Sequence, residues 1–368
     1  MEVKNNYNRT LTNIGASIQH YFNIQPVHKT LPEVDILLGQ HHPKNVVTIL
    51  LDGLGTNILN RSLPEDAFLR KNLKKSLTTV FPATTAAATT SIRTGLNPVE
   101  HGYLGWTMYI EPIDKVITLF LNTEKGNDEA ECQGYLPYRK KFLSSPTISE
   151  QIKKAGTGQA FELFPFGENP YSNLDDLMAR IEKLAHQKGK RYIYAYDEEP
   201  DATMHENGPD SEKARQVILE RNQKIEHLSQ KLHDTLLLVI SDHGHILTKT
   251  IYLNEYPDIV ALLDGKTSID QRAAIFKVKP GKKAIFRKLF EQNFGQYYKL
   301  YDSDEVASSK LFGDGPENPL YRAALGDFLA IAIANVAITA EGDHYFLSHH
   351  AGYTDDEILI PLIAKYCK

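Results

Sequence analysis

Three separate apolar runs of this chain each lead into aspartate or into aspartate and histidine. VVTILL ends at Asp52, RYIYAYDEEP leads to Asp201 and His205, and LLLVIS is followed by Asp242 and His243. Short runs rich in β-branched and aliphatic residues are typical of buried strands, and open α/β sheets bind ligands at the carboxyl ends of their strands. We therefore expect the three segments to meet at one edge of a sheet.

The residue types at these three positions indicate a metal centre. Carboxylate oxygen combined with imidazole nitrogen suits Zn²⁺ or a similar divalent ion. Asp201 and His205 are four residues apart, so a single helical turn or a tight loop could direct both at one ion. Any one of these residues, taken alone, is as readily explained as a cap or a hydrogen-bonded loop residue. The whole set in this order favours metal binding.

The composition excludes several other classes of protein. The 368 residues are 42% hydrophobic and 24% charged, with a net charge of −5, so neither a nucleic-acid polymer nor an anionic membrane surface is an expected partner. The N-terminal residues lack the apolar segment of a signal peptide, and no run approaches the roughly 18 apolar residues of a membrane helix. Cys132 and Cys367 lie far apart, which indicates neither a disulfide framework nor a thiolate zinc site. A cytoplasmic location is the simplest expectation.

Strand-like and helix-like segments alternate through most of the chain. Amphipathic helical patterns at 173–189 and 211–233 separate apolar runs, an arrangement that predicts a mostly parallel sheet covered by helices on both faces. The expected fold class is α/β, a three-layer α/β/α sandwich. The strands are expected at 46–51, about 158–165, 191–196 and 235–240.

From about residue 256 the rhythm changes to shorter pieces, which predict a small inserted α+β cap. FLAIAIANVAIT and EILIPLIAKY are then expected to return to the main sheet. The predicted domains are a core of residues 1–255 and 326–368 and a cap of residues 256–325.

The segment TTVFPATTAAATTSIRTG places hydroxyl groups at the start of an expected helix. Alanine-rich sequence after a threonine, with a stop at Gly95, predicts a helix with a threonine N-cap. One interpretation is therefore purely structural. The other is that a hydroxyl here meets a phosphate, because a helix N-terminus offers free N–H groups and a positive dipole to an anion. A hydroxyl held by a metal ion also ionises near neutral pH.

Together these motifs resemble the alkaline phosphatase superfamily and, within it, the type I phosphodiesterase/nucleotide pyrophosphatase family. Members of that family commonly carry a nucleophilic threonine nine residues before the threonine of a Thr-Gly pair, which here selects Thr85 and not Thr84. Alkaline phosphatase proper follows its serine with two alanines, as Ala86 and Ala87 follow Thr85. The resemblance covers about 46–106, 191–245 and 345–361, and rests on Asp52-Gly53, Thr94-Gly95-Leu96, His101-Gly102, EEPDATMH and SDHG.

The resemblance implies two divalent metal ions, with Zn²⁺ as the first choice and Mn²⁺ as the alternative. Asp201, His205 and a C-terminal histidine would hold the first ion. Counting back from the Pro-Leu of SHHAGYTDDEILIPL selects His350, with His349 as the alternative. His101 and His245 are expected outside the ligand set. The second ion would be held by Asp52, Asp242, His243 and the oxygen of Thr85.

The function implied is hydrolysis of small-molecule phosphate esters, as a phosphodiesterase or nucleotide pyrophosphatase, through a covalent phosphothreonine on Thr85. A phosphomonoesterase, a phosphonate hydrolase or a phosphomutase on the same scaffold is the alternative. A metal-binding module without catalysis has no need of Thr85. Sulfatase chemistry is not expected, because the Cys/Ser-x-Pro-x-Arg motif is missing.

One departure from the family bears on the substrate. Nucleotide pyrophosphatases usually have an asparagine three residues after the nucleophile, where this chain has Ala88. The backbone N–H of Ala86 is the only donor assigned to the phosphoryl group. Diesters are expected to react better than monoesters, because a monoester dianion calls for an additional cation. The candidates for that cation are Arg93, Arg272 and the lysines of 277–283, and those for an apolar wall are Tyr103, Trp106 and Tyr109.

Overall fold

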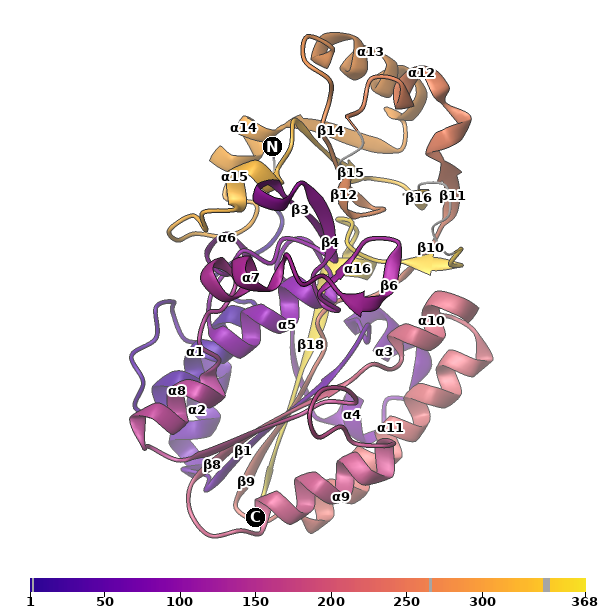
Figure 1. Cartoon of the computed structure of the whole chain (residues 1–368). Coiled ribbons are helices and arrows are strands. Elements are labelled where there is room, and N and C mark those ends of the chain that lie inside the picture. The colour runs from indigo at the N-terminus through magenta and orange to yellow at the C-terminus, as the bar shows by residue number, and fades with distance from the viewer. Residues whose placement is uncertain (2, 265–266, 340–344) are drawn as a thin grey trace.

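Six strands form the central sheet of the computed structural model, which describes residues 1, 3–264, 267–339 and 345–368 (Figure 1). Four neighbouring strands run parallel, and the last strand of the chain lies antiparallel beside them. The prediction of a mostly parallel sheet is confirmed. The order across the sheet is β2 (Leu73–Thr78), β18 (Leu359–Cys367), β9 (Thr235–Ile240), β1 (Asn45–Leu51), β8 (Arg191–Asp197) and β7 (Gln159–Leu163).

Helices cover both faces of this sheet, so the predicted three-layer sandwich is confirmed. Side chains alternate along a strand, and β1 accordingly sends Val47 and Ile49 into one apolar core and Val46 and Leu50 into the other. On one face lie α1 (Leu11–Tyr21), α2 (Pro32–His41), α5 (Thr85–Thr94) and α8 (Ile148–Ala155). On the other lie α3 (Thr56–Ser62), α4 (Phe68–Lys71), α9 (Leu174–Ala185) and α11 (Glu212–Lys231).

The expected helices at 173–189 and 211–233 begin at their capping residues and end before residues 189 and 233. Asn173 accepts a hydrogen bond from the N–H of Asp176 at 3.0 Å, and Ser211 accepts one from Ala214 at 3.1 Å. Helix α5 stops at Gly95, whose φ of 71° is a left-handed conformation that glycine adopts without strain. These caps fix the start of α9 and α11 and the length of α5.

A smaller part above the main sheet contains a second, antiparallel sheet (Figure 1). Helix α13 (Lys283–Phe294) packs Phe286, Phe290 and Phe294 against it. A parallel pair, β11 (Lys249–Tyr252) and β16 (Val336–Thr339), lies beside the same core. The strands of the sheet are, in order, β12 (Ser268–Asp270), β13 (Ala273–Phe276), β15 (Phe328–Ala332) and β14 (Tyr298–Asp302).

The expected return of FLAIAIANVAIT to the main sheet is wrong. Strand β15 pairs with β13 and β14, and β16 pairs with β11. A run of consecutive apolar residues is typical of a strand buried on both faces. The small sheet buries β15 in this way, so the pattern cannot tell which of the two sheets the strand joins. EILIPLIAKY does return to the main sheet, as β18.

A third sheet was not anticipated from the sequence. Met108, Ile110 and Ile117 of this sheet share an apolar core with Ile275 and Leu329 of the small sheet. The part above the main sheet therefore continues past residue 325 and draws on a second, earlier segment as well as the predicted insertion. Its strands are β3 (Thr107–Ile110), β4 (Lys115–Thr118), β5 (Thr123–Glu124) and β6 (Asn127–Glu131).

Within the described ranges, no helix has the length and apolar character needed to cross a membrane.

Short elements complete the fold. The strands β10 (Ile246–Leu247) and β17 (Ser348–His349) pair near the top of the core. The remaining helices are α6 (Pro98–His101), α7 (Leu136–Phe142), α10 (Asp201–Asn207), α12 (Pro257–Val260), α14 (Ser303–Ser308), α15 (Tyr321–Ala324), α16 (Asp355–Ile358) and the 3₁₀ turns η1 (Glu111–Ile113) and η2 (Leu253–Glu255).

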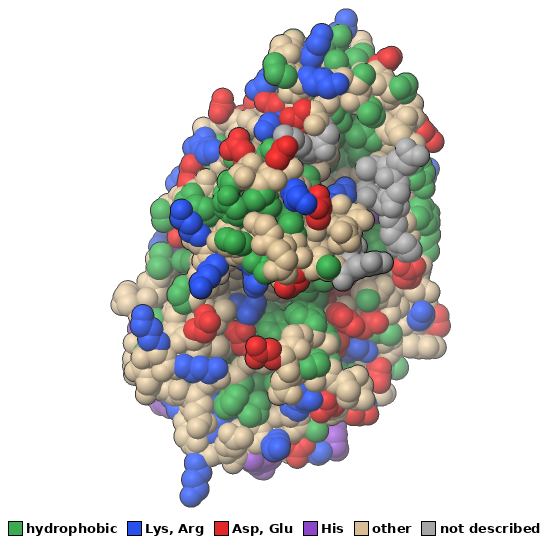
Figure 2. All heavy atoms as spheres, in the orientation of Figure 1, with side chains coloured by type: hydrophobic (Ala, Val, Ile, Leu, Met, Phe, Trp, Pro, Cys, Tyr) green, Lys and Arg blue, Asp and Glu red, His purple; other side chains and the backbone are tan. Residues whose placement is uncertain are grey.

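Charged side chains of both signs are spread over the surface. Figure 2 shows Lys and Arg side chains lying among Asp and Glu over one face of the molecule, in the orientation of Figure 1. This mixture agrees with a net charge of only −5 on 368 residues. The face shown offers a mixed field rather than a broad basic surface of the kind that binds a polyanion.

Candidate metal centre

The carboxyl ends of three adjacent parallel strands bring the candidate residues together. Asp52 directly follows β1, and Asp242 and His243 follow β9. Asp201 and His205 lie one turn apart on α10, which follows β8. Because β8, β1 and β9 are neighbours, all of these side chains lie at one edge of the sheet.

Asp52, Asp242 and His243 form one buried set, which we call the Asp52 group. One ligand atom from each lies within 4.8 Å of the others. Nε2 of His243 is 3.2 Å from Oδ1 of Asp52. The hydroxyl of Thr85 completes this arrangement, because its oxygen lies 3.3 Å from both Oδ2 of Asp52 and Nε2 of His243.

The Asp52 group contains more carboxylate than its protein surroundings balance. Burial raises the pKa of Asp52 and of Asp242 well above the ordinary value. The negative charge of Asp201 raises the pKa of Asp52 further, and that of Asp52 raises the pKa of Asp242. Oδ1 of Asp242 accepts N–H groups of Gly53 and His243, each at 3.0 Å. Its Oδ2 is buried and accepts no hydrogen bond from the described residues. An orphaned buried carboxylate oxygen fits a bound cation.

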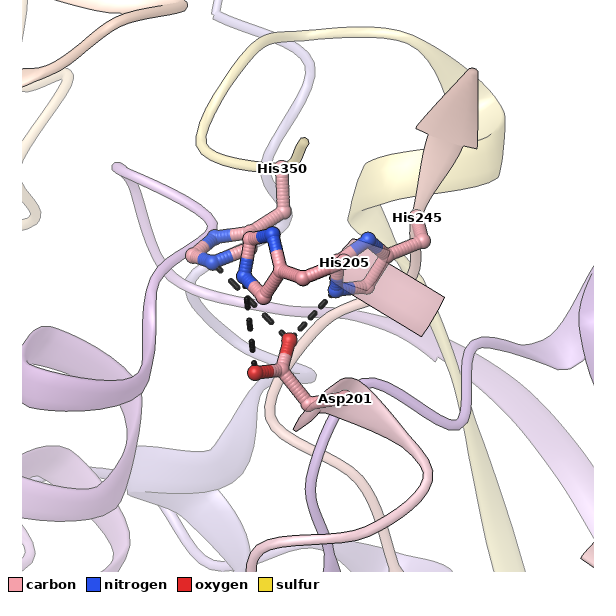
Figure 3. A group of neighbouring side chains, drawn as sticks. All are labelled: Asp201, His205, His245 and His350. Atoms are coloured by element: carbon pink, nitrogen blue, oxygen red, sulfur yellow. Dashed lines mark hydrogen bonds and ion pairs between the residues drawn. The ribbon is translucent and has the colours of Figure 1, made fainter. Parts of the chain in front are cut away.

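Asp201, His205, His245 and His350 form a second set, the Asp201 group. Figure 3 shows the carboxylate of Asp201 below three imidazoles that converge on it. Nε2 of His205 is 3.5 Å from Oδ2, Nε2 of His350 is 4.0 Å from Oδ1, and Nε2 of His245 contacts Oδ1. The ring of His350 stacks on that of His243 at 3.7 Å, so the two groups adjoin.

The far nitrogens of these histidines face hydrogen-bond acceptors. Nδ1 of His205 lies 2.8 Å from the carbonyl of Ser348, and Nδ1 of His350 lies 2.9 Å from the carbonyl of Ala83. A carbonyl accepts only from N–H, so each Nδ1 carries a proton and Nε2 is the nitrogen left to face an ion. Neutral imidazoles with a free Nε2 are the form that binds metal.

The protonation states of the Asp201 group agree with this arrangement. Burial lowers the pKa of His350 well below its ordinary value and that of His245 to about 4. Burial alone would raise the pKa of Asp201, but the imidazoles of His205 and His245 hold it well below its usual range. Asp201 therefore supplies an ionised carboxylate, and His245 and His350 supply neutral imidazoles, donors that suit Zn²⁺.

Of the two C-terminal histidines, the structure brings His350 into the group. His349 belongs to β17, where its Nδ1 lies 2.7 Å from the hydroxyl of Thr248. Neighbouring residues of an extended segment point to opposite sides, so only one of the two can face Asp201. His245, left out of the expected ligand set, lies against Asp201; its place two residues after His243 in DHGH is the only sequence signal for it.

Helix α5 presents Thr85 rather than Thr84 to the Asp52 group. Thr84 occupies the N-cap position, yet its side chain makes no capping hydrogen bond, so the structural interpretation of this threonine pair is not supported. Thr85 is the first residue of the helix, where backbone N–H groups lack intrahelical partners. Ala88 is buried in the apolar core and supplies no polar donor.

Both arginines and three of the four lysines named from the sequence as candidate cations have other partners. Arg93 pairs with Glu162 at 2.5 Å, and Arg272 makes two bonds to Glu357 at 2.6 and 2.8 Å. Among the lysines of 277–283, Lys277 lies over the ring of Tyr109, Lys279 donates to a carbonyl and Lys283 pairs with Asp327.

The aromatic candidates divide into two kinds. Trp106 stacks on Phe120 with ring centroids 5.5 Å apart, and Phe120 packs on Tyr196, whose hydroxyl donates to Oδ2 of Asp52 at 2.5 Å. Tyr109 is buried and donates to Asp114. Tyr103 lies beside His101, which holds its loop through Ser91. Of the three predicted residues, only Trp106 connects with the site.

Comparison with known proteins agrees with this geometry. The family model described as "Type I phosphodiesterase / nucleotide pyrophosphatase" matches residues 46–353. Similar solved structures include murine ectonucleotide pyrophosphatase/phosphodiesterase 5, also as an inactive threonine-to-alanine variant in complex with AMP, and the human protein of the same name. Each is 20% identical, covers 87% of both chains and has a TM-score of 0.67. No curated protein sequence matches the chain significantly.

Proposed function

The chain belongs to the type I phosphodiesterase/nucleotide pyrophosphatase family and is a phosphoric ester hydrolase, and we propose that it cleaves phosphodiesters through a covalent phosphothreonine on Thr85. We propose further that two divalent ions, one in each ligand group, support the reaction. Zn²⁺ is the preferred ion, because both groups combine carboxylate oxygen with imidazole nitrogen.

The observation that carries this proposal is the place of the Thr85 hydroxyl. It lies 3.3 Å from both a carboxylate and an imidazole of the Asp52 group, at the first residue of a helix. The similar murine structure in complex with AMP is an inactive threonine-to-alanine variant, which supports a catalytic threonine in this family.

The chemistry follows from the residues around that hydroxyl. Oγ1 of Thr85 gives up its proton and attacks phosphorus, the bond from phosphorus to the leaving oxygen breaks, and that oxygen takes up a proton and departs as an alcohol. Water then attacks the same phosphorus and breaks its bond to Oγ1, which regains a proton from the water. Bound divalent ions would supply positive charge for the nucleophile and the leaving oxygen. The free N–H of Ala86 at the start of α5 would donate to a phosphoryl oxygen. Two in-line displacements give net retention at phosphorus.

A diester suits the surroundings better than a monoester. A monoester dianion carries one more charged oxygen than a diester, and Arg93 and Arg272 are both paired with glutamates. The second substituent of a diester needs an apolar or aromatic surface, which Trp106 and Phe120 offer beside Tyr196. Nucleotide-like diesters and pyrophosphates are the substrate class we favour.

A matched pair of aryl phosphates tests the proposal. We expect metal-loaded protein to hydrolyse a bis-aryl or alkyl-aryl diester with a higher kcat/KM than the monoester of the same phenol. A preference of about tenfold for the monoester, equal to about 1.4 kcal/mol in transition-state binding, would instead favour a phosphomonoesterase. Release of phosphate from a phosphonate would favour a phosphonate hydrolase, and conversion of one phosphosugar into its isomer would favour a phosphomutase.

A further inference from the structure

A buried ion pair joins the small sheet to the loop that carries His350. Arg272 lies in the turn between β12 and β13, Glu357 lies in α16, and both side chains are wholly buried. The guanidinium donates from Nε to Oε1 of Glu357 at 2.6 Å and from Nη2 to Oε2 at 2.8 Å, a bidentate geometry. Its Nη1 donates to the carbonyls of Ala334 and Val336 at 2.9 and 2.6 Å. Every nitrogen of this arginine is therefore bound within the protein.

The carboxylate of Glu357 also holds the loop that follows His350. Its Oε1 accepts the backbone N–H of Gly352 at 2.7 Å, and its Oε2 accepts the N–H and the hydroxyl of Thr354 at 3.1 and 2.7 Å. A Cβ on Gly352 would lie only 2.7 to 2.8 Å from the carboxylate and the guanidinium, so the ion pair packs directly on the backbone there. A capping box at the start of α16 explains the bonds of Thr354, but it explains neither the buried Arg272 nor the bond from Gly352.

The residue next to His350 shows that this loop is held in a strained conformation. Ala351 has a φ of 80°, which a residue with a Cβ adopts only where its surroundings fix it from several sides. On one side, the N–H of Ala351 donates to the carbonyl of Ala83 at 2.9 Å, the same carbonyl that Nδ1 of His350 faces. On the other side, Glu357 holds Gly352. The orientation of His350 therefore depends on both anchors.

The backbone of Glu357 reaches the segment that carries the other histidines. Its carbonyl accepts the N–H of Gly244 at 2.8 Å, and Gly244 lies between His243 and His245. A Cβ on Gly244 would collide with the carbonyl oxygen of Asp356, so the DHGH turn packs directly on α16. A single residue of α16 thus contacts the segments that carry candidate ligands of both groups.

We propose that Glu357 is a positioning residue for the metal centre: paired with Arg272, it fixes the loop of His350 and makes the ligand set depend on the docking of the small sheet. The inference rests on the proposed ion in the Asp201 group. Metal ligands need support from the residues around them, and loss of such a residue typically weakens metal affinity by about 10- to 100-fold. Arg272, named from the sequence as a candidate cation for the substrate, acts here through Glu357 instead.

Three variants separate positioning from stability. Glu357→Gln and Arg272→Met each leave one buried charge unpaired, which destabilises the fold whatever the role of the pair. The double variant Arg272→Met/Glu357→Gln removes both charges and should regain most of the lost melting temperature. We expect all three variants to bind one of two Zn²⁺ ions about 10- to 100-fold more weakly in calorimetric titration and the other within about threefold of wild type. A purely structural role predicts that the double variant regains wild-type affinity together with its stability.

Hydrogen exchange in metal-free protein provides a readout that needs neither an ion nor turnover. We expect the peptide of residues 348–354 to exchange about tenfold faster in Glu357→Gln and in the double variant, because the loop loses the anchor at Gly352. The peptide of β1 reports global unfolding and should change less. Glu162→Gln is the matched control, since it breaks an Arg–Glu pair that ties α5 to β7. It should leave residues 348–354 and both ion affinities unchanged.

Equal acceleration of exchange in the two peptides, or wild-type affinity for both ions in Glu357→Gln, would overturn the positioning role. Slow exchange of residues 348–354 in the double variant would likewise leave the pair with a structural role only. Wild type that binds neither Zn²⁺ nor Mn²⁺, or that hydrolyses no diester with ions bound, would overturn the proposed function. The exchange experiment would still decide whether Glu357 holds the loop of His350.

Discussion

The two ligand groups are built from the same residue types but balance their charge in opposite ways. The Asp52 group sets two carboxyls against one imidazole in a wholly buried position. The Asp201 group sets one carboxyl against three imidazoles and is partly open. Accordingly the carboxyl pKa values move up in the first group and down in the second.

This difference indicates what each group contributes. In the Asp201 group the imidazoles of His205 and His245 hold the pKa of the carboxyl low, so its ionised form is favoured before any ion binds. The Asp52 group keeps an orphaned oxygen and opposed carboxyls, so the metal-free protein holds it at a cost in folding free energy. The Asp52 group also contacts the Thr85 hydroxyl, so the group that is strained without its ion lies next to the proposed nucleophile.

The largest effect should come from the nucleophile. Thr85→Ala removes the attacking oxygen and should lower kcat by about 10⁴-fold or more, while elemental analysis shows nearly unchanged metal content. Thr84→Ala is the matched control, because Thr84 neighbours Thr85 but its hydroxyl makes no hydrogen bond with any residue that the structure describes, and its effect should be much milder. The opposite ranking of the two variants would assign the nucleophile to Thr84.

Chelation should have the next largest effect and should act on both groups at once. We expect complete loss of activity together with a lower melting temperature, since ions that bind only the folded state stabilise it by about 4 kcal/mol per site at a free concentration 1,000 times Kd. Restoring about two equivalents of Zn²⁺ or Mn²⁺ per chain should restore both. Full activity in protein that elemental analysis shows to be metal-free would contradict the assignment of two ion sites.

Sequence patterns located the strand ends because they depend on local chemistry. Apolar runs that stop at Asp52, Asp242 and His243 predicted both the strands and the edge at which they meet. The helix from Thr85 to Gly95 followed from its alanines and its terminal glycine. Which groups bind an ion, and the cytoplasmic location, stay predictions.

The sequence could not predict which of two similar positions in the fold a segment or side chain occupies. The apolar run at 328–332 fits either sheet, because both bury their central strands, and its placement was predicted wrongly. Neighbouring His349 and His350 differ only in the side of the chain they occupy.

A smaller effect should separate the Asp201 group from its neighbour. His245 contacts Oδ1 of Asp201 and is held through its Nδ1, 3.0 Å from the hydroxyl of Ser348. Loss of a residue that orients a metal ligand typically weakens metal affinity by about 10- to 100-fold. His245→Gln should therefore weaken one of the two ions by this amount in calorimetric titration and leave the other unchanged.

His349→Gln is the matched control for that titration, because His349 is buried nearby but bonds Thr248 and not Asp201. Equal weakening of both ions by His245→Gln would show that the two groups bind metal as one coupled unit. In that case the contrast between them would apply only to the metal-free protein.

The smallest expected effect is a change in the free energy of unfolding. It tests the charge balance of the two groups most directly, because we expect opposite signs for a substitution in each group. In metal-free protein, Asp242→Asn keeps an oxygen for the N–H groups of Gly53 and His243 and places an NH₂ where the orphaned Oδ2 now lies. It should raise the free energy of unfolding. Asp201→Asn removes the charge that faces three imidazoles and should lower it. Each change should be on the order of 1 kcal/mol, the equivalent of one pKa unit.

The pH dependence of these two changes follows from the direction of each pKa. The folded pKa of Asp242 is raised, so the cost of its charge grows as the pH rises above the ordinary value of 3.8 and is complete above the folded pKa. The gain from Asp242→Asn should therefore vanish as the pH falls toward 3.8. The folded pKa of Asp201 is lowered, so its contribution is complete above 3.8 and is lost only below it; the loss from Asp201→Asn should stay constant from pH 8 to 5. Urea unfolding of chelated wild type and both variants across this range measures all three. Changes of the same sign would mean that charge balance within the two groups is alike, and that an orphaned oxygen beside Thr85 does not strain the metal-free protein.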